Sequence, residues 1–225
     1  SFLLDRLPEK PGYFGFKHHY ILHALDSEVL CDILLAMDEK RCLELTVRSP
    51  GSKDEEKTHT VYPIKVYVST QSGRQYLLCY HYRFRRFMFF RLDAIHMVVA
   101  GAAEKKPEKF VGWYEAYKGH LWGVSTTSSR STEHIEMIIR IAEGEEYILE
   151  RLEREKRCGR AEMRDAHTAV FTADVYDASE MLPWIRTFIG RIEKLECSNS
   201  RVTERFYSDL AAMAAMYGGD ADAVS

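Results

Sequence analysis

The residues between positions 61 and 101 concentrate positive charge beside aromatic rings. This stretch holds six basic residues and a single acid, Asp93, so its net charge is +5 in a chain whose net charge is −3. Arginine binds phosphate groups in a bidentate manner, and tyrosine can stack on a nucleobase. The stretch therefore predicts a surface that binds a nucleotide or single-stranded nucleic acid. The candidate ligand-binding residues are Lys65, Tyr76, Tyr80, His81, Arg83, Arg85, Arg86 and Arg91.

Two simpler explanations fit the same residues. Basic side chains on a strand are often simply solvated. Arg91 also lies two positions before Asp93, on the same side of a strand, where the two side chains can pair. The same alternation places Tyr76 and Tyr80 on the face opposite His81. One ligand cannot therefore contact all of the candidate residues.

The remaining reactive residues indicate neither catalysis nor metal binding. Cys79 and His81 share a strand face, but this spacing is far more common in a packed core than in a catalytic Cys–His pair. The five cysteines form no CxxC pair, and the nine histidines show no metal-ligand spacing. We therefore expect a protein that is not an enzyme and that has no metal or other cofactor.

The composition predicts a cytoplasmic protein without a membrane segment. Hydrophobic residues make up 46% of the 225 residues, enough to bury a core in one large or two small domains. No apolar run approaches the ~18 residues of a membrane span, and the charges that follow Leu4 argue against a signal peptide. Scattered cysteines are typical of a reducing compartment.

Strands must carry the basic residues of the first half. Alternating apolar and polar residues predict strands over 43–47, 61–69, 75–82 and 86–97, with turns at 71–74 and 83–85. Gly73 supplies the positive φ that the first turn needs. A polar loop is expected over 49–58. Helical spacing predicts helices over 17–25 and 27–40, with Asp26 or Ser27 as the cap of the second.

The second half alternates between strands and helices. A helix is expected over 110–122, and the low-complexity run 125–132 marks a domain boundary. Strands are then expected at 134–142, 161–165, 168–176 and 193–197, with helices at 145–157 and from 178 to Gly190. The order β-α-β-β-α-β predicts a ferredoxin-like fold. A last helix over 201–217 carries an apolar stripe.

Two motifs resemble the WYL domain of bacterial transcriptional regulators. Residues 73–77 (GRQYL) and 90–95 (FRLDAI) follow the family's order of a Trp-Tyr-Leu strand and a strand ending in Phe-Arg-Leu-Asp-Arg-Ile, and Pro63 opens the strand before them. The sequence departs from the pattern at three positions. Gln75 stands in place of the Trp, Ala94 in place of the second Arg, and Met88 in place of an Arg before the Phe.

The resemblance extends over roughly residues 15–217 and implies a fold and a site. The fold is a small Sm-like or SH3-like β-barrel, and its basic face is the family's effector site. Residues 180–186 (EMLPWIR) are similar to the C-terminal extension, called WCX, that follows many WYL domains. A winged helix-turn-helix usually precedes the WYL domain. We see no such pattern here and expect that this chain is a fragment that lacks it.

We therefore predict an α+β protein in four parts. Residues 1–40 form a linker and lead helix, and residues 41–102 form a WYL-type β-barrel. Residues 103–132 form a helical connector. Residues 133–225 form a WCX-type ferredoxin-like unit with a C-terminal helix.

The predicted function is the effector-sensing and oligomerisation part of a bacterial transcriptional regulator. Its effector is a nucleotide or short single-stranded nucleic acid, and operator DNA binds through the missing N-terminal domain. One alternative is an RNA-binding or single-stranded-DNA-binding accessory module of the CRISPR-associated type, and another is a small-molecule sensor. Because regulators that bind palindromic operators are symmetric, we expect a homodimer. Its expected contacts follow Ser131 and include Trp184, Phe188, Val202, Phe206, Leu210, Met213 and Tyr217.

Overall fold

The computed structural model describes residues 28–48, 56–69, 73–125 and 131–217 of the chain. The expected helix over 17–25 and its neighbouring caps lie outside the described residues. Contacts divide the chain into two compact units. The first unit contains the residues up to 85 together with 90–104, and the second contains residues 86–89 and those from 105 onwards. Each unit has its own sheet and its own core.

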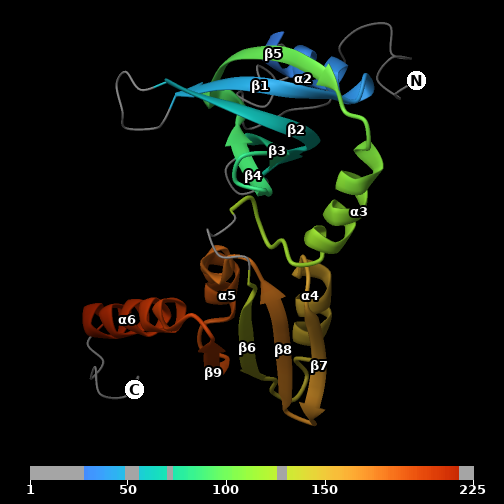
Figure 1. The fold of residues 1–225 in the computed structure, drawn as a ribbon. Helices are drawn as coiled ribbons and strands as arrows, with labels where there is room; N and C mark the ends of the chain where they lie inside the picture. Colours follow the sequence, from blue (N-terminus) through green and yellow to red (C-terminus); the bar gives the residue numbers. More distant parts are fainter. Residues whose placement is uncertain (1–27, 49–55, 70–72, 126–130, 218–225) are drawn as a thin grey trace, which may run out of the picture. The chain divides into compact units, whose positions relative to one another are not determined.

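The first unit is a helix packed on a five-stranded sheet. Helix α2 (Glu28–Asp38) lies beside the strands β1 and β5 (Figure 1). The sheet order is β4-β3-β2-β1-β5. The strands are β1 (Arg41–Arg48), β2 (Glu56–Val68), β3 (Gln75–His81), β4 (Arg86–Arg91) and β5 (Ile95–Ala103).

The five-stranded sheet stays open. Strands β4 and β5 are its two edges, and no pairing between them closes it within the described residues. The α+β class is confirmed, but the closed barrel that the sequence predicted is not formed. The predicted strand 86–97 was also wrong. It is two strands, separated by a 3-10 turn, η2 (Leu92–Ala94), because Leu92 and Ile95 are both buried and their spacing of three suits one helical turn.

The core of the first unit lies between α2 and the sheet. On α2, Leu30, Ile33 and Ala36 recur at intervals of three and are all buried. They pack toward the sheet, where Leu43 and Leu45 alternate on β1 and are fully buried. Burial of side chains this large contributes about 1.5–3 kcal/mol each, so this stripe fixes the helix on the sheet.

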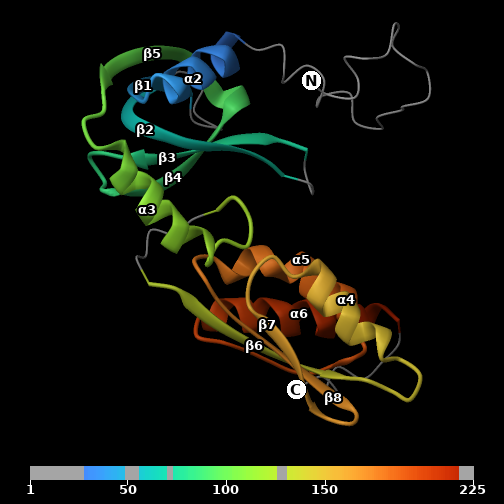
Figure 2. The ribbon, with the colours of Figure 1, turned by 90° about the vertical axis from the view of Figure 1, so that its right-hand side faces the viewer.

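The second unit has the predicted βαββαβ order. Helix α3 (Pro107–Lys118) precedes it and begins with proline, whose missing N–H costs nothing in a first turn. The sheet order β7-β8-β6-β9 with antiparallel neighbours is that of a ferredoxin-like fold, which confirms the prediction. Figure 2 shows α4 and α5 on the same face of this sheet. The elements are β6 (Glu133–Arg140), α4 (Tyr147–Glu155), β7 (Arg160–Asp165), β8 (Thr168–Val175), η3 (Ala178–Met181), α5 (Leu182–Ile185), η4 (Arg186–Phe188), β9 (Ile192–Cys197) and α6 (Ser200–Met216).

Aromatic rings form the centre of the second core. The ring of Trp184 lies 4.8 Å from that of Trp122 and 5.0 Å from that of Phe171. Phe188 packs on the other side of Trp184, with ring centroids 5.3 Å apart. Trp184 is 9% exposed and Phe188 is 1% exposed. Both therefore stabilise the core of their own unit, and little of either side chain is exposed for contact with a second copy.

The apolar stripe of α6 divides into a buried and an exposed half. Asn199 caps the helix, since its side chain accepts a hydrogen bond from the backbone N–H of Arg201. Val202 and Phe206 are buried in the core of the unit. Farther along the helix, Met213 is 36% exposed and Tyr217 is 85% exposed. The apolar side chains of the last turns are therefore the exposed part of this stripe.

Two glycines with the same backbone conformation give a test of the second sheet. Gly159 and Gly144 have φ values of 85° and 80°. A Cβ on Gly159 would lie 2.5 Å from the carbonyl oxygen of Thr172, whereas one on Gly144 would meet nothing within 4 Å. We expect Gly144→Ala to cost about 1–2 kcal/mol through its φ alone.

Gly159→Ala should cost about 1–3 kcal/mol more, because the added methyl group overlaps the backbone of β8. Urea unfolding of the two variants measures the difference. Equal losses of stability in both would contradict the close packing of residue 159 against β8.

Candidate ligand-binding site

The eight candidate residues lie on three strands and one turn of the chain. Lys65 is on β2, Tyr76, Tyr80 and His81 are on β3, and Arg86 and Arg91 are the two ends of β4. Arg83 and Arg85 lie in the turn that joins β3 to β4. Lys65, Arg83 and Arg85 are exposed, His81 is buried, and the other four are half-buried.

The turn from Tyr82 to Arg85, called the β3–β4 turn below, presents charge to solvent. The N–H of Arg85 donates to the carbonyl oxygen of His81 at 2.8 Å, which closes the turn. Arg85 has a φ of 52°, a left-handed conformation that is uncommon for a residue with a side chain. Phe84 is 45% exposed, and the guanidinium carbon of Arg83 lies 5.8 Å from its ring centroid. Two arginines therefore flank an aromatic ring at the tip of a hairpin.

His81 faces the interior and supports this turn from below. It is 3% exposed, and its Nε2 lies 3.0 Å from Nδ1 of His59 on β2. The ring of His81 packs on Phe84 with centroids 4.5 Å apart, and that of His59 packs on Phe90 at 4.9 Å. The sequence pattern placed His81 opposite the tyrosines but missed His59, because the predicted strand began only at 61 whereas β2 begins at Glu56.

Three side chains anchor the start of the turn. The hydroxyl of Tyr82 donates to Oε2 of Glu104 at 2.6 Å, and it lies 3.1 Å from Sγ of Cys42. Burial, followed by these hydrogen bonds, raises the pKa of Tyr82 far above its ordinary value. The phenol therefore stays protonated and holds the turn to the end of β5. No sequence signal pointed to this contact, since the residues stand 40 and 22 positions apart.

Arg91 already has a carboxylate partner. Its Nε donates to Oδ1 of Asp93 at 2.9 Å and its terminal nitrogen donates to Oδ2 at 2.6 Å. The guanidinium of Arg91 lowers the pKa of Asp93, and the same hydrogen bonds raise the pKa of Arg91. The pairing anticipated from the sequence is therefore present. A ligand anion must compete with Asp93 for this arginine.

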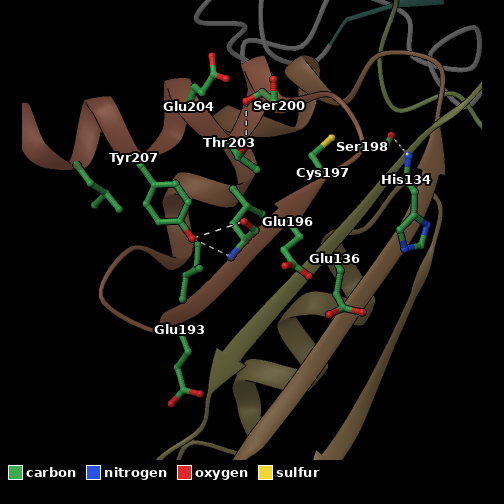
Figure 3. Close-up of a pocket in the computed structure, with 13 residues that line it drawn as sticks. His134, Glu136, Glu193, Glu196, Cys197, Ser198, Ser200, Thr203, Glu204 and Tyr207 are labelled. Atoms are coloured by element: carbon green, nitrogen blue, oxygen red, sulfur yellow. Dashed lines mark hydrogen bonds between the residues drawn. The ribbon is translucent and has the colours of Figure 1, made fainter. Parts of the chain in front are cut away.

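The second unit contains a groove between β9 and α6, called the β9–α6 groove below. Its volume is about 1080 Å³. Tyr207 of α6 reaches the strand, where its hydroxyl accepts a hydrogen bond from the N–H of Leu195 at 3.1 Å. Figure 3 shows the side chains that line it. These are His134, Glu136, Ile192, Glu193, Leu195, Glu196, Cys197, Ser198, Ser200, Thr203, Glu204, Tyr207 and Leu210.

Neither unit gathers the ligands of a metal ion within the part of the chain that the structure describes. No three histidine, cysteine, aspartate or glutamate side chains there lie close enough to bind one ion together. None of the described helices is long and apolar enough to cross a bilayer.

Comparisons with known proteins identify the first unit. The family model described as "WYL domain" matches residues 28–100, from the start of α2 to the end region of β5. Residues 28–100 are therefore similar to the WYL domain. The departures at Gln75, Met88 and Ala94 lie within the matched residues. No curated protein matches the sequence.

Two solved structures are similar to this chain to different degrees. The protein described as a "CRISPR Cas-related protein" is 12% identical, with a TM-score of 0.54, over 88% of this chain and 53% of that one. The proteasome accessory factor B/C (PafBC) of Arthrobacter aurescens is 13% identical, with a TM-score of 0.33, over 85% of this chain and 28% of that one. This chain thus spans about a quarter to a half of the length of these proteins.

The His59–His81 pair predicts a loss of stability in mild acid. Burial, and then the charge of Lys57, lower the pKa of His59 below its value of about 6.5 in an unfolded chain. The neutral ring is therefore favoured in the folded state, and its contribution is fully present above about pH 6.5. It should be lost as the pH falls through the lower folded pKa.

Thermal unfolding between about pH 7.5 and 5 measures this effect. His59→Gln should reduce the acid-dependent fall of Tm, and His96→Gln, which changes an exposed residue of β5, should leave it unchanged. The same pH profile in the wild type and in both variants would show that the His59–His81 pair does not titrate with folding.

Proposed function

We propose that this chain is the effector-sensing and oligomerisation part of a bacterial transcriptional regulator. Its ligand is a nucleotide or a short single-stranded nucleic acid, and the WYL domain binds it without catalysing a reaction. The observation that carries this proposal is the gathering of cations and tyrosines on β2, β3 and the β3–β4 turn of a WYL domain. Operator DNA would bind to a separate domain.

The exposed cations support electrostatic recognition of phosphate. Lys65, Arg83 and Arg85 are exposed, so their charges reach an incoming anion at little desolvation cost. Tyr76 and Tyr80 are half-buried on β3 and supply ring surface on which a base can stack. Ring stacking with phosphate contacts is tolerant of sequence, which suits a short nucleic acid or a nucleotide equally well.

A second candidate function is an accessory module that binds RNA or single-stranded DNA and has no regulatory DNA-binding domain. The similarity of the fold to that of the CRISPR Cas-related protein supports this second candidate function. The two functions share the basic surface and differ in what the protein does with the bound strand. A small-molecule sensor is the third candidate, and failure to bind any oligonucleotide at low salt favours it.

The second unit supports the oligomerisation role in this proposal. Its ferredoxin-like fold and its EMLPWIR segment at 180–186 fit the WCX extension. The exposed end of α6, with Met213, Met216 and Tyr217, is one apolar surface of this unit that a homodimer would cover. Sedimentation of the chain with and without residues 210–225 tests this contribution.

The first functional prediction concerns salt. Labelled single-stranded oligonucleotides should bind the chain and should release counterions as they do so. With about three phosphates neutralised, the affinity should fall about twentyfold between about 50 and 200 mM salt. Fluorescence anisotropy measures the affinity at the two salt concentrations. No binding at low salt would exclude the nucleic-acid effector, while salt-independent binding would exclude phosphate contacts.

The second functional prediction compares how much the different arginines contribute to oligonucleotide binding. The double variant R83A/R85A should weaken oligonucleotide binding at least tenfold, because both charges are exposed and contribute through phosphate contacts. Arg91→Ala should weaken it less, since Asp93 already neutralises that guanidinium. Asp93→Asn should strengthen binding by releasing Arg91. Anisotropy titrations of the three variants give this order.

Arg48→Ala is the matched control, because Arg48 is exposed and paired with Glu56 outside the basic stretch. It should change the affinity less than twofold. If Arg91→Ala lowers Tm strongly and leaves affinity unchanged, Arg91 has a structural role only. If R83A/R85A binds as well as the wild type, the β3–β4 turn is not part of the ligand site.

A further inference from the structure

We propose that the β9–α6 groove binds the β3–β4 turn of a second copy of this chain. The groove is acidic at its rim and apolar within, and the turn is cationic with an exposed aromatic ring. Two such contacts, related by a two-fold axis, would close a dimer in which each copy supplies one turn and one groove.

The rim of the groove has an excess of negative charge. Glu136, Glu193, Glu196 and Glu204 line it, and no lysine or arginine does so among the described residues. Figure 3 shows Glu204 and Glu193 toward opposite ends, with Glu136 and Glu196 between them. Glu136 and Glu196 are also directly opposite each other on β6 and β9. Like charges in that position destabilise a sheet, and a bound cation relieves the repulsion.

Cations of the same unit compensate only part of this charge. Lys194 lies 2.7 Å from Glu196 and pairs with it. Lys194 also interacts electrostatically with Glu136. Glu193 and Glu204 have no ion pair within the described part of the chain, so these two carboxylates remain for an external partner.

The interior of the groove accommodates an apolar side chain. Ile192, Leu195 and Leu210 line it between the carboxylates. The side chain of Tyr207 reaches from α6 to β9, where its hydroxyl accepts a hydrogen bond from the N–H of Leu195. This N–H, in the middle of the edge strand β9, already has a partner and is not open to pairing with an added β-strand. A β-strand is therefore not the best occupant of the groove. A compact turn with a ring at its tip fits the groove better.

The β3–β4 turn has the complementary chemistry. Arg83 and Arg85 are exposed on either side of Phe84, which is itself 45% exposed. The closed turn and the packing of Phe84 on His81 fix this arrangement before any contact forms. The backbone of the turn and the Phe84 ring therefore lose little freedom on binding, which raises the affinity of a small contact.

The charge distribution of the chain favours a second copy as the source of the turn. Residues 61–101 carry +5, whereas residues 102–225 carry −5 and residues 1–60 carry −3. Two basic sheets repel each other, and so do two acidic units, whereas opposite parts of two copies attract. Association between copies should therefore pair the basic turn of one with the acidic groove of the other.

This contact does not require the proposed function, but it uses two of the same residues. Arg83 and Arg85 cannot bind a phosphate and a carboxylate of a second copy at once. A single-stranded oligonucleotide that binds the turn would therefore compete with the dimer contact. Ligand binding would release the groove, which gives the effector a direct physical effect on assembly.

A charge-swap experiment tests the proposal with the full chain. The turn variant R83E/R85E and the groove variant E193K/E204K should each weaken self-association at least tenfold, measured by sedimentation at about 50 mM salt. Mixed in equal amounts, they should associate with each other, because the reversed turn of one matches the reversed groove of the other. The control E143K/E150K reverses two exposed carboxylates outside the groove and should leave self-association unchanged.

The outcomes are distinct. If the two variants stay monomeric when mixed, or if the groove variant alone associates like the wild type, the proposal is overturned. Circular dichroism of each variant excludes unfolding as the cause. Oligonucleotide binding is measured in parallel: the groove variant should retain it, and the turn variant should lose it if the proposed function holds. If association recovers when the two variants are mixed, the contact between copies is supported. If neither the wild type nor either variant binds an oligonucleotide, the nucleic-acid effector is refuted.

Discussion

The hydrogen bond from Tyr82 to Glu104 fixes the point from which the basic turn projects. With Cys42 beside the same hydroxyl, it joins the ends of β1, β3 and β5, which are far apart in the sequence. A charge-assisted hydrogen bond to a carboxylate is about twice as strong as a neutral one, and partial burial preserves that strength. The hairpin tip is therefore attached to the sheet at its base, and its two exposed arginines keep a defined spacing.

The His59–His81 pair supports the other side of the same turn. It supplies a polar contact beneath Phe84 where only apolar packing would otherwise hold the ring. One imidazole must donate and the other must accept, so the pair is stable only while at least one ring is neutral. The turn is thus coupled to pH by the buried His81 and the half-buried His59, and not by the residues at its exposed tip.

Local periodicity predicted most of the fold, and long-range contacts account for what it missed. Alternation placed β1, β3, β6 and β8 within one or two residues, and the βαββαβ order gave the ferredoxin-like unit. The break at Leu92 was missed because apolar residues at 90, 92 and 95 fit either a continuous strand or a strand with a turn. The candidate site was predicted as a set of charges. Its internal partners, His59 and Glu104, were not, because nothing local in the sequence links them to positions 81 and 82.

The contrast between Arg91 and Arg83 shows why charge counts alone did not define the site. Both belong to the same basic stretch, but Arg91 lies two residues from the only acid in it and forms two hydrogen bonds with that acid. Arg83 has an aromatic ring as its neighbour, which attracts the guanidinium weakly and leaves its N–H groups available. A cation that packs on a ring keeps its capacity for a carboxylate or a phosphate. Available charge is therefore concentrated at the hairpin tip, and both the ligand and the second copy are expected to meet the protein there.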